Sequence, residues 1–195
     1  MEKKKTKRQI AKPGDTIAIP LYNGKFMYAR RYKSGMGFYD YITDEIIKDV
    51  NILKSKNILF HEGVYIDVLS SGVWPKIGKI SFESEEESWG PVKCISNLPF
   101  NNGFRYSHKN TNYGDPTYKD CYDFEFSSVS ERWHVEMRLI HYIETGKDHP
   151  RMWDRLAMPE FQIKQAWQDL YNPDILVDIL AFEERIKKEK WYDDL

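Results

Sequence analysis

The fold of this chain is decided by residues 16–43, which read TIAIPLYNGKFMYARRYKSGMGFYDYIT. Thr16 to Leu21 and Lys25 to Tyr32 are rich in β-branched and aromatic residues, which predicts two strands, with Pro20 at the end of the first. Asn23-Gly24 between them is the strongest short signal for a hairpin turn. Gly35-Met36-Gly37 predicts a second turn, which leads into a third strand over Phe38 to Thr43. Three short strands with tight turns form an antiparallel meander, which suits a bent sheet or a small SH3-like barrel.

Further strands are predicted over residues 64–69, 73–82 and 92–96, and residues 44–56 read as a short helix or an irregular link. The C-terminal third reads as helical. Ser128 to Glu131 forms a capping box and Gly146 is a stop signal, so a helix is predicted to end at about Thr145. A second helix is predicted over 159–171, and Asn172-Pro173 opens a third.

Strands followed by helices predict the α+β class, an antiparallel sheet or small barrel packed with C-terminal helices. We expect three parts: a basic disordered tail over residues 1–12, a β-rich part over 13–126, and a helical part over 127–195 that belongs to the same domain or forms a small appendage.

The composition predicts a chain with a core of its own and an acidic body. The 195 residues are 41% hydrophobic and 15% aromatic, and aromatic side chains bury large areas. Residues 1–12 hold six of the 29 basic and one of the 30 acidic residues, which leaves the rest of the chain with a net charge of −6. An acidic body disfavours a nucleic-acid-binding surface and suits a basic protein partner.

The absence of recognisable targeting signals indicates the cellular compartment in which the protein is expected. No apolar run approaches the roughly 18 residues of a membrane span. Residues 1–12 lack the apolar stretch of a secretory signal, and Glu2 excludes N-myristoylation. We therefore expect a cytosolic protein without a membrane partner. Cys94 and Cys121 have no further cysteine at metal-binding spacing, and in the cytosol both are expected to be reduced thiols.

The predicted helix over 130–145 carries a cationic stripe of His134, Arg138 and His141. At 100° per residue these side chains share one face, opposite an apolar side formed by Trp133, Met137, Ile140 and Ile143. The two histidines lie about 10.5 Å apart along the helix axis, too far to share a metal ion easily. The stripe is therefore either a solvated helix face or a surface for a phosphate or an acidic partner.

A polar stretch from 99 to 124 combines aromatic residues with Asn, Gly and Ser. This composition is typical of adaptable protein-binding loops, and aromatic anchors dominate interface energies. Two alternatives remain open: the aromatic side chains pack back onto the core, or together with the basic residues they bind single-stranded nucleic acid. The candidate partner-binding residues of this stretch are Phe104, Tyr106, Tyr113 and Tyr118.

A second candidate surface is the densest acidic cluster in the chain. It is either a solvated turn or a surface that steers a basic partner, an effect that raises association rates more than affinity. Its residues are Glu83, Glu85, Glu86 and Glu87.

Motifs for catalysis are absent from the sequence. It has no Gly-x-Ser-x-Gly nucleophile elbow and no glycine-rich phosphate cradle. We therefore assign no catalytic residue, metal site or cofactor, and expect a protein that binds rather than an enzyme. A hydrolase whose site residues form no linear motif remains an alternative.

The block Gly14-Asp15-Thr16-Ile17-Ala18-Ile19-Pro20-Leu21, followed by Gly24-Lys25, resembles the opening of the immunity protein 26 family. Phe38-Tyr39-Asp40, Trp74 and Ile77-Gly78 resemble later blocks of that family, so the resemblance covers about residues 13–80. The chain departs from the family pattern in the second strand, where Ala29-Arg30-Arg31 stands in place of a Gly-Arg pair.

The resemblance implies an immunity protein of a bacterial polymorphic toxin system, which neutralises a cognate toxin by binding it stoichiometrically. Some relatives carry a phosphotriesterase label, which makes a metal-dependent phosphotriester-type hydrolase an alternative, although this sequence shows no cluster of metal ligands. A nucleic-acid-binding module is the other alternative. The matching residues Gly14, Asp15, Pro20 and Gly24 are expected to build turns and strand ends.

Overall fold

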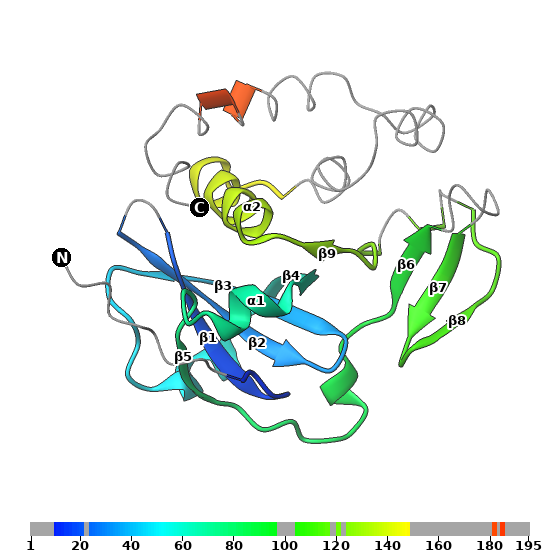
Figure 1. Ribbon diagram of the computed structural model, residues 1–195, viewed down its shortest axis with the longest axis horizontal. Helices are drawn as coiled ribbons and strands as arrows, with labels where there is room; N and C mark the ends of the chain where they lie inside the picture. Colours follow the sequence, from blue (N-terminus) through cyan, green and yellow to red (C-terminus); the bar gives the residue numbers. More distant parts are fainter. Residues whose placement is uncertain are drawn as a thin grey trace. The chain divides into compact units, whose positions relative to one another are not determined.

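The computed structural model describes residues 10–21, 24–96, 104–117, 120–121, 124–148, 181–182 and 184–185. The chain divides into two compact units, Met1–Pro91 and Val92–Leu195 (Figure 1). The predicted basic tail over residues 1–9, the turn residues Tyr22 and Asn23, and nearly all of the helices predicted beyond residue 158 lie outside the described residues. We describe each unit by itself.

The first unit is built on an antiparallel sheet. Its strands are hydrogen-bonded in the order β5-β1-β2-β3-β4. Register shifts interrupt three of the four pairings, and such bulges bend a sheet. No closed barrel forms in the described part of the chain, so of the two predicted forms the bent sheet is the one observed. The strands are β1 (Asp15–Pro20), β2 (Phe26–Tyr32), β3 (Gly35–Thr43), β4 (Ile58–Val64) and β5 (Lys76–Lys79).

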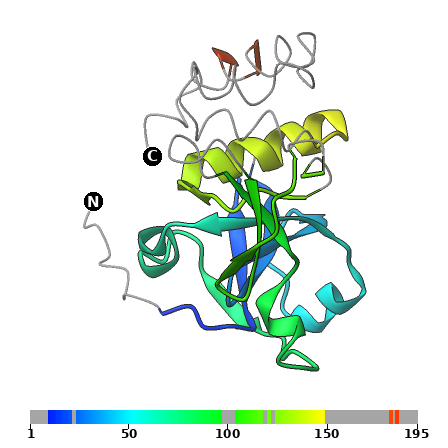
Figure 2. The ribbon, with the colours of Figure 1, turned by 90° about the vertical axis from the view of Figure 1, so that its right-hand side faces the viewer.

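Both faces of this sheet are buried. On one face, Ile17 on β1 lies opposite Ala29 on β2. On the same face, the ring of Phe38 stacks on that of Phe60, with 4.6 Å between the ring centroids, and meets the ring of Trp74 edge-on. On the other face a cluster contains Ala18, Tyr28, Tyr39, Leu53 and Ile80. The short helices η1 (Val50–Ser55) and α1 (Ile66–Ser70) lie on opposite sides of the strands (Figure 2).

The region between β3 and β5 differs from the prediction. Residues 64–69 were expected to form a strand, but β4 ends at Val64 and α1 follows it, while β4 itself was not predicted. α1 buries only Val68 and Leu69. An apolar pattern of so few residues does not distinguish a helical turn from a strand.

The glycines of the second predicted turn belong to β3 instead. The turn consists of Lys33 and Ser34. A Cβ atom on Gly35 would lie 2.8 Å from the carbonyl oxygen of Glu62, and one on Gly37 would lie 2.7 Å from the ring of Tyr32. These positions require glycine because neighbouring groups approach the backbone closely.

The Gly14-Asp15 pair holds the start of β1 in place. Gly14, at φ +90°, donates a hydrogen bond from its N–H to the carbonyl of Arg31 and accepts one from the N–H of Ile80, both at 2.8 Å. The buried carboxylate of Asp15 accepts a hydrogen bond from the N–H of Lys12 at 2.8 Å and pairs with Lys76 at 3.0 Å. These two residues therefore build the fold, as the sequence predicted.

The second unit contains a three-stranded antiparallel sheet in the order β6-β7-β8. Lys109 and Asn110, both at positive φ, form the two-residue turn between β7 and β8, as a type I′ hairpin turn requires. The stretch expected to be a long loop therefore contains a hairpin. The strands are β6 (Lys93–Ser96), β7 (Phe104–His108) and β8 (Thr111–Tyr113), and a two-residue strand β9 (Val129–Ser130) precedes the helix α2 (Arg132–Thr145).

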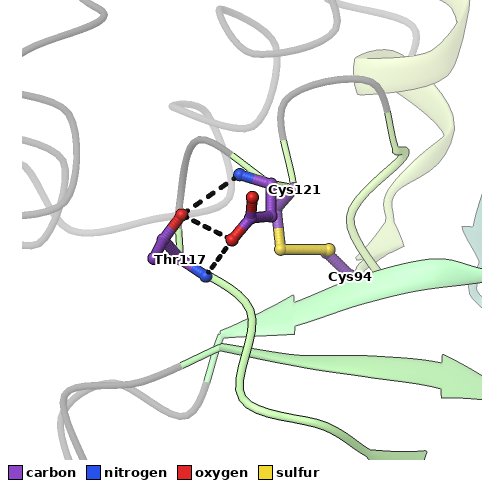
Figure 3. The surroundings of a disulfide bond; sticks show 4 residues. Cys94, Thr117 and Cys121 are labelled. Carbon is purple, nitrogen blue, oxygen red and sulfur yellow. Dashed lines mark hydrogen bonds between the residues drawn. A yellow bond between two sulfur atoms is a disulfide. The ribbon is translucent and has the colours of Figure 1, made fainter.

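Cys94 and Cys121 form a disulfide, so the expectation of two reduced thiols was wrong (Figure 3). The bond lies in a cluster with the buried Phe126, and it links β6 to a turn in which the N–H and hydroxyl of Thr117 both donate to the carboxylate of Asp120. The two cysteines are 27 residues apart in sequence, and only the fold brings them together.

The helix α2 ends where the sequence predicted. Gly146 adopts φ +70° and donates its N–H to the carbonyl of Tyr142 at 2.8 Å. At the other end, Glu131 and not Ser128 is the N-cap residue, so the predicted capping box was wrong.

Candidate functional site

The acidic segment, residues 83–87, lies at the surface of the first unit and is anchored to the sheet. The side chain of Arg30 on β2 is only 8% exposed, and its Nη1 donates to Oε1 of Glu87 at 3.0 Å. The other carboxylate oxygen of Glu87 accepts the N–H of Glu83 at 2.7 Å. Glu87 therefore fixes the conformation of the segment as well as its position.

Further contacts attach the segment to the turn between β2 and β3. The N–H of Lys33 donates to the carbonyl of Ser88 at 2.8 Å, and the ammonium of Lys33 pairs with Glu85 and lies 4.9 Å from the ring centroid of Trp89. The hydroxyl of Ser34 donates to the carbonyl of Trp89. The short helix η2 (Glu87–Trp89) completes the turn.

Exposed carboxylates are thus carried on a segment that is hydrogen-bonded to the rest of the first unit. Glu83, Glu85, Glu86 and Glu87 are all exposed. A segment whose backbone is already held in one conformation loses less conformational entropy on binding. The arrangement suits electrostatic attraction of a basic surface.

The buried guanidinium of Arg30 organises the groups behind this surface. Its Cζ lies 3.7 Å from the ring centroid of Phe82, and its Nη2 donates to the carbonyl of Ser81 at 3.0 Å. Burial raises the pKa of Tyr39 to about 12, and it also raises the pKa of Tyr32, while Arg30 opposes both shifts. Both phenols therefore remain protonated at neutral pH and are poorly suited to general base catalysis.

The aromatic residues of the predicted binding loop mostly pack inward. Phe104 and Tyr106 pack against the disulfide cluster, and the ring centroids of Tyr106 and Phe124 are 5.3 Å apart. Tyr113 on β8 is 46% exposed. Tyr118 lies outside the described residues. Of the three described candidates in this stretch, Tyr113 therefore presents the most surface to a partner.

The surroundings of Arg105 concern the nucleic-acid alternative for this loop. Arg105 pairs with Asp115 at 2.6 Å and donates to the carbonyl of Gly114 at 2.7 Å. The carboxylate of Asp115 offsets the positive charge that a phosphate would meet at Arg105.

The cationic stripe of α2 is not an exposed face. Arg138 is 3% exposed and binds Asp148 through two hydrogen bonds of 2.8 and 2.6 Å, and its Nη2 also pairs with Glu125 at 3.0 Å. Burial acts to lower the pKa of Arg138, but the two carboxylates outweigh it and raise the pKa above its ordinary value.

The histidines of the stripe have similarly enclosed surroundings. His141 is buried and meets Phe182 edge-on, and the ring of His134, which is half-buried, lies 3.5 Å from that of Trp133. Both interpretations of the stripe, a solvated face or a phosphate or acidic-partner surface, require exposed side chains, and Arg138 and His141 are buried. Helical periodicity identified a polar face but could not identify the acidic residues that cover it.

The described ranges contain no group of three His, Cys, Asp or Glu residues that could hold a metal ion. In the same part of the chain, no helix is long and apolar enough to cross a membrane.

Comparison with known protein families gives a match for the N-terminal part of the chain. Residues 12–102 match the family model of immunity protein 26. No curated protein and no solved structure shows significant similarity to the chain. The matched region includes the complete β1 to β5 sheet and the acidic segment, together with β6 of the second unit.

Proposed function

We propose that this chain, whose residues 12–102 match the family model of immunity protein 26, is an immunity protein that binds and neutralises a cognate bacterial toxin domain. The family match is the observation that carries the proposal. Neutralisation is stoichiometric: the immunity protein covers or distorts the active site of the toxin, and it needs no cofactor for this. The toxin belongs to a polymorphic toxin system.

The acidic segment supports a toxin with a basic surface. Its carboxylates are exposed, and contacts to Arg30 and Lys33 hold the segment in place. A toxin that acts on nucleic acid carries basic residues where it binds phosphates, so an acidic surface that covers these residues would compete with the substrate.

The proposal is tested by isothermal titration of the full chain against the toxin domain encoded beside it. We expect a one-to-one complex and loss of toxin activity at equimolar immunity protein. Absence of binding together with retention of RNA or DNA that salt removes would overturn the proposal in favour of a nucleic-acid-binding module. Hydrolysis of a phosphotriester by metal-loaded protein without toxin binding would favour the hydrolase.

The contribution of the acidic segment is tested with a matched pair of variants. Glu83→Lys with Glu86→Lys reverses two charges in the segment and keeps Glu87, which anchors Arg30. Asp40→Lys with Glu45→Lys makes the same charge change at exposed positions elsewhere in the first unit. We expect the first pair to slow association more than the second, and the difference to shrink at high salt. Equal effects would exclude the acidic segment from the interface.

A further inference from the structure

A small pocket lies beside α1. Its volume is about 100 Å³, and it is lined by Arg31 and Ser70 together with the aliphatic residues Ile10, Ala11, Val64, Ile66 and Leu69. The acidic segment plays no part in its lining. The pocket is therefore a separate feature of the first unit.

The rim of this pocket exposes large apolar side chains. Ile66 is 79% exposed and Ile10 is 73% exposed, and Tyr65, next to Ile66 in the chain, is 51% exposed. Single exposed apolar residues are common on proteins, but a group of them around a concavity is typical of an interaction site. Covering these side chains would remove apolar area from water.

Among the described residues, Arg31 differs from the buried arginines Arg30 and Arg138 because no carboxylate side chain pairs with its guanidinium. Arg30 pairs with Glu87, and Arg138 pairs with Glu125 and Asp148. Arg31 donates from Nη1 to the carbonyl of Gly35 at 2.8 Å, and within the described part of the chain it forms no ion pair. Burial alone lowers the pKa of Arg31.

This combination selects a particular kind of ligand. A guanidinium has five N–H donors in a planar fork, which binds a carboxylate through two parallel hydrogen bonds. A carboxylate placed on Arg31 would be partly shielded from water by the aliphatic walls, which strengthens the interaction. A large apolar side chain next to that carboxylate would pack on Ile10, Ile66 and Leu69.

We propose that the Arg31 pocket binds a segment of a partner protein in which a carboxylate lies next to a large apolar side chain. The carboxylate pairs with Arg31 and the apolar side chain covers Ile66 and Ile10. If the proposed function is correct, the partner is the toxin, which then offers this segment in addition to a basic surface. The preference of the pocket for a carboxylate next to an apolar side chain does not depend on whether the partner is a toxin.

The probe is the peptide acetyl-Gly-Asp-Leu-Asp-Gly-amide, titrated to millimolar concentration into the ¹⁵N-labelled full chain and followed by amide chemical shifts. We expect saturable shifts at Arg31 and over residues 64–70. Two matched peptides separate the contributions: one carries Asn in place of both Asp residues, and the other carries Ser in place of Leu. Each is expected to bind about tenfold more weakly or not at all.

Variants of the protein make the test independent of stability. Ile66→Asp changes a side chain that is 79% exposed, so the variant is expected to fold, and its carboxylate repels that of the peptide. Ile52→Asp, at a 42% exposed isoleucine of η1 outside the pocket, is the control. Arg31→Met removes the cation, but it also removes the hydrogen bond to Gly35, so Ile66→Asp is the decisive variant.

Several outcomes would overturn the proposal. These are absence of shifts with the Asp peptide, equal shifts with the Asn peptide, or equal binding by Ile66→Asp and wild type. A dimer of the chain that Ile66→Asp breaks and Ile52→Asp retains would assign the pocket to a second copy instead. Failure to bind any toxin leaves a positive peptide result intact, and toxin binding without peptide binding rejects only the pocket.

Discussion

Arg30 and Glu87 are 57 residues apart in sequence, and their side chains form an ion pair of 3.0 Å. The side chain of Arg30 is 8% exposed, and that of Glu87 is 40% exposed. The pair therefore links a cation inside the first unit to an acidic segment at its surface. Glu87 neutralises the buried charge of Arg30 and also holds the acidic segment in position. Substitution of Glu87 should therefore affect both stability and binding.

Glu87→Gln should destabilise the first unit by about 1.5–3 kcal/mol, because it weakens a hydrogen bond to a charged and largely buried group. Urea unfolding measures the change. Glu83→Gln, an exposed acid of the same segment, should stay within about 0.5 kcal/mol of the wild type. If the two variants are equally stable, the ion pair between Arg30 and Glu87 does not contribute to the stability of the first unit.

Gly14→Ala should cost more than Gly24→Ala, although both glycines have positive φ. A Cβ at Gly24 meets nothing within 4 Å, whereas one at Gly14 lies 2.8 Å from the carbonyl oxygen of Ile80. We expect about 1 kcal/mol for Gly24→Ala from the backbone conformation alone. The added steric conflict should bring Gly14→Ala to about 2–3 kcal/mol. Thermal unfolding of both variants provides the comparison, and equal costs would contradict the close approach at Gly14.

Removal of the disulfide should destabilise the second unit selectively. The 27-residue separation of Cys94 and Cys121 predicts a loss of about 3.5 kcal/mol for the double change to alanine, from the loop entropy of the unfolded chain. Amide exchange should accelerate in β6 to β8, while β1 to β3 serve as the internal control. Two reactive thiols in the unfolded, unreduced wild-type protein would show that the bond does not form.

The stability of the first unit should fall in alkaline solution because of Tyr39. Its pKa is raised to about 12 by burial, with Arg30 opposing the shift, so the folded state favours the neutral phenol. The contribution of Tyr39 to the free energy of unfolding is complete below pH about 10, the ordinary pKa of tyrosine, and is lost as the pH rises through about 12.

Ultraviolet absorbance during an alkaline titration follows the ionisation of Tyr39. Tyr39→Phe should remove one late ionisation step. Tyr113→Phe, at a tyrosine that is 46% exposed, should leave that step in place. A titration of Tyr39→Phe identical to that of the wild type would contradict the assignment.

Features that depend only on neighbouring residues could be predicted from the amino-acid sequence. The alternation over Ile17 and Ile19, the turn signal before Phe26 and the stop at Gly146 identified β1, β2 and the end of α2, because strand period and backbone preference are local properties. The same residues carried the family resemblance, and the family match over residues 12–102 confirmed it. The sequence also located the acidic segment, because like charges adjacent in the chain are visible without a structure.

The tertiary structure decided which residues these elements meet. The sequence placed Arg138 and His141 on a polar helix face, but Glu125, Asp148 and Phe182 enclose them. It read Gly35 and Gly37 as a turn because the close approach of Glu62 and Tyr32 involves other strands. The Cys94–Cys121 bond, the Arg30–Glu87 pair and the Arg31 pocket likewise join distant segments. Burial and pairing of charges depend on the whole packed unit, so no local pattern could reveal them.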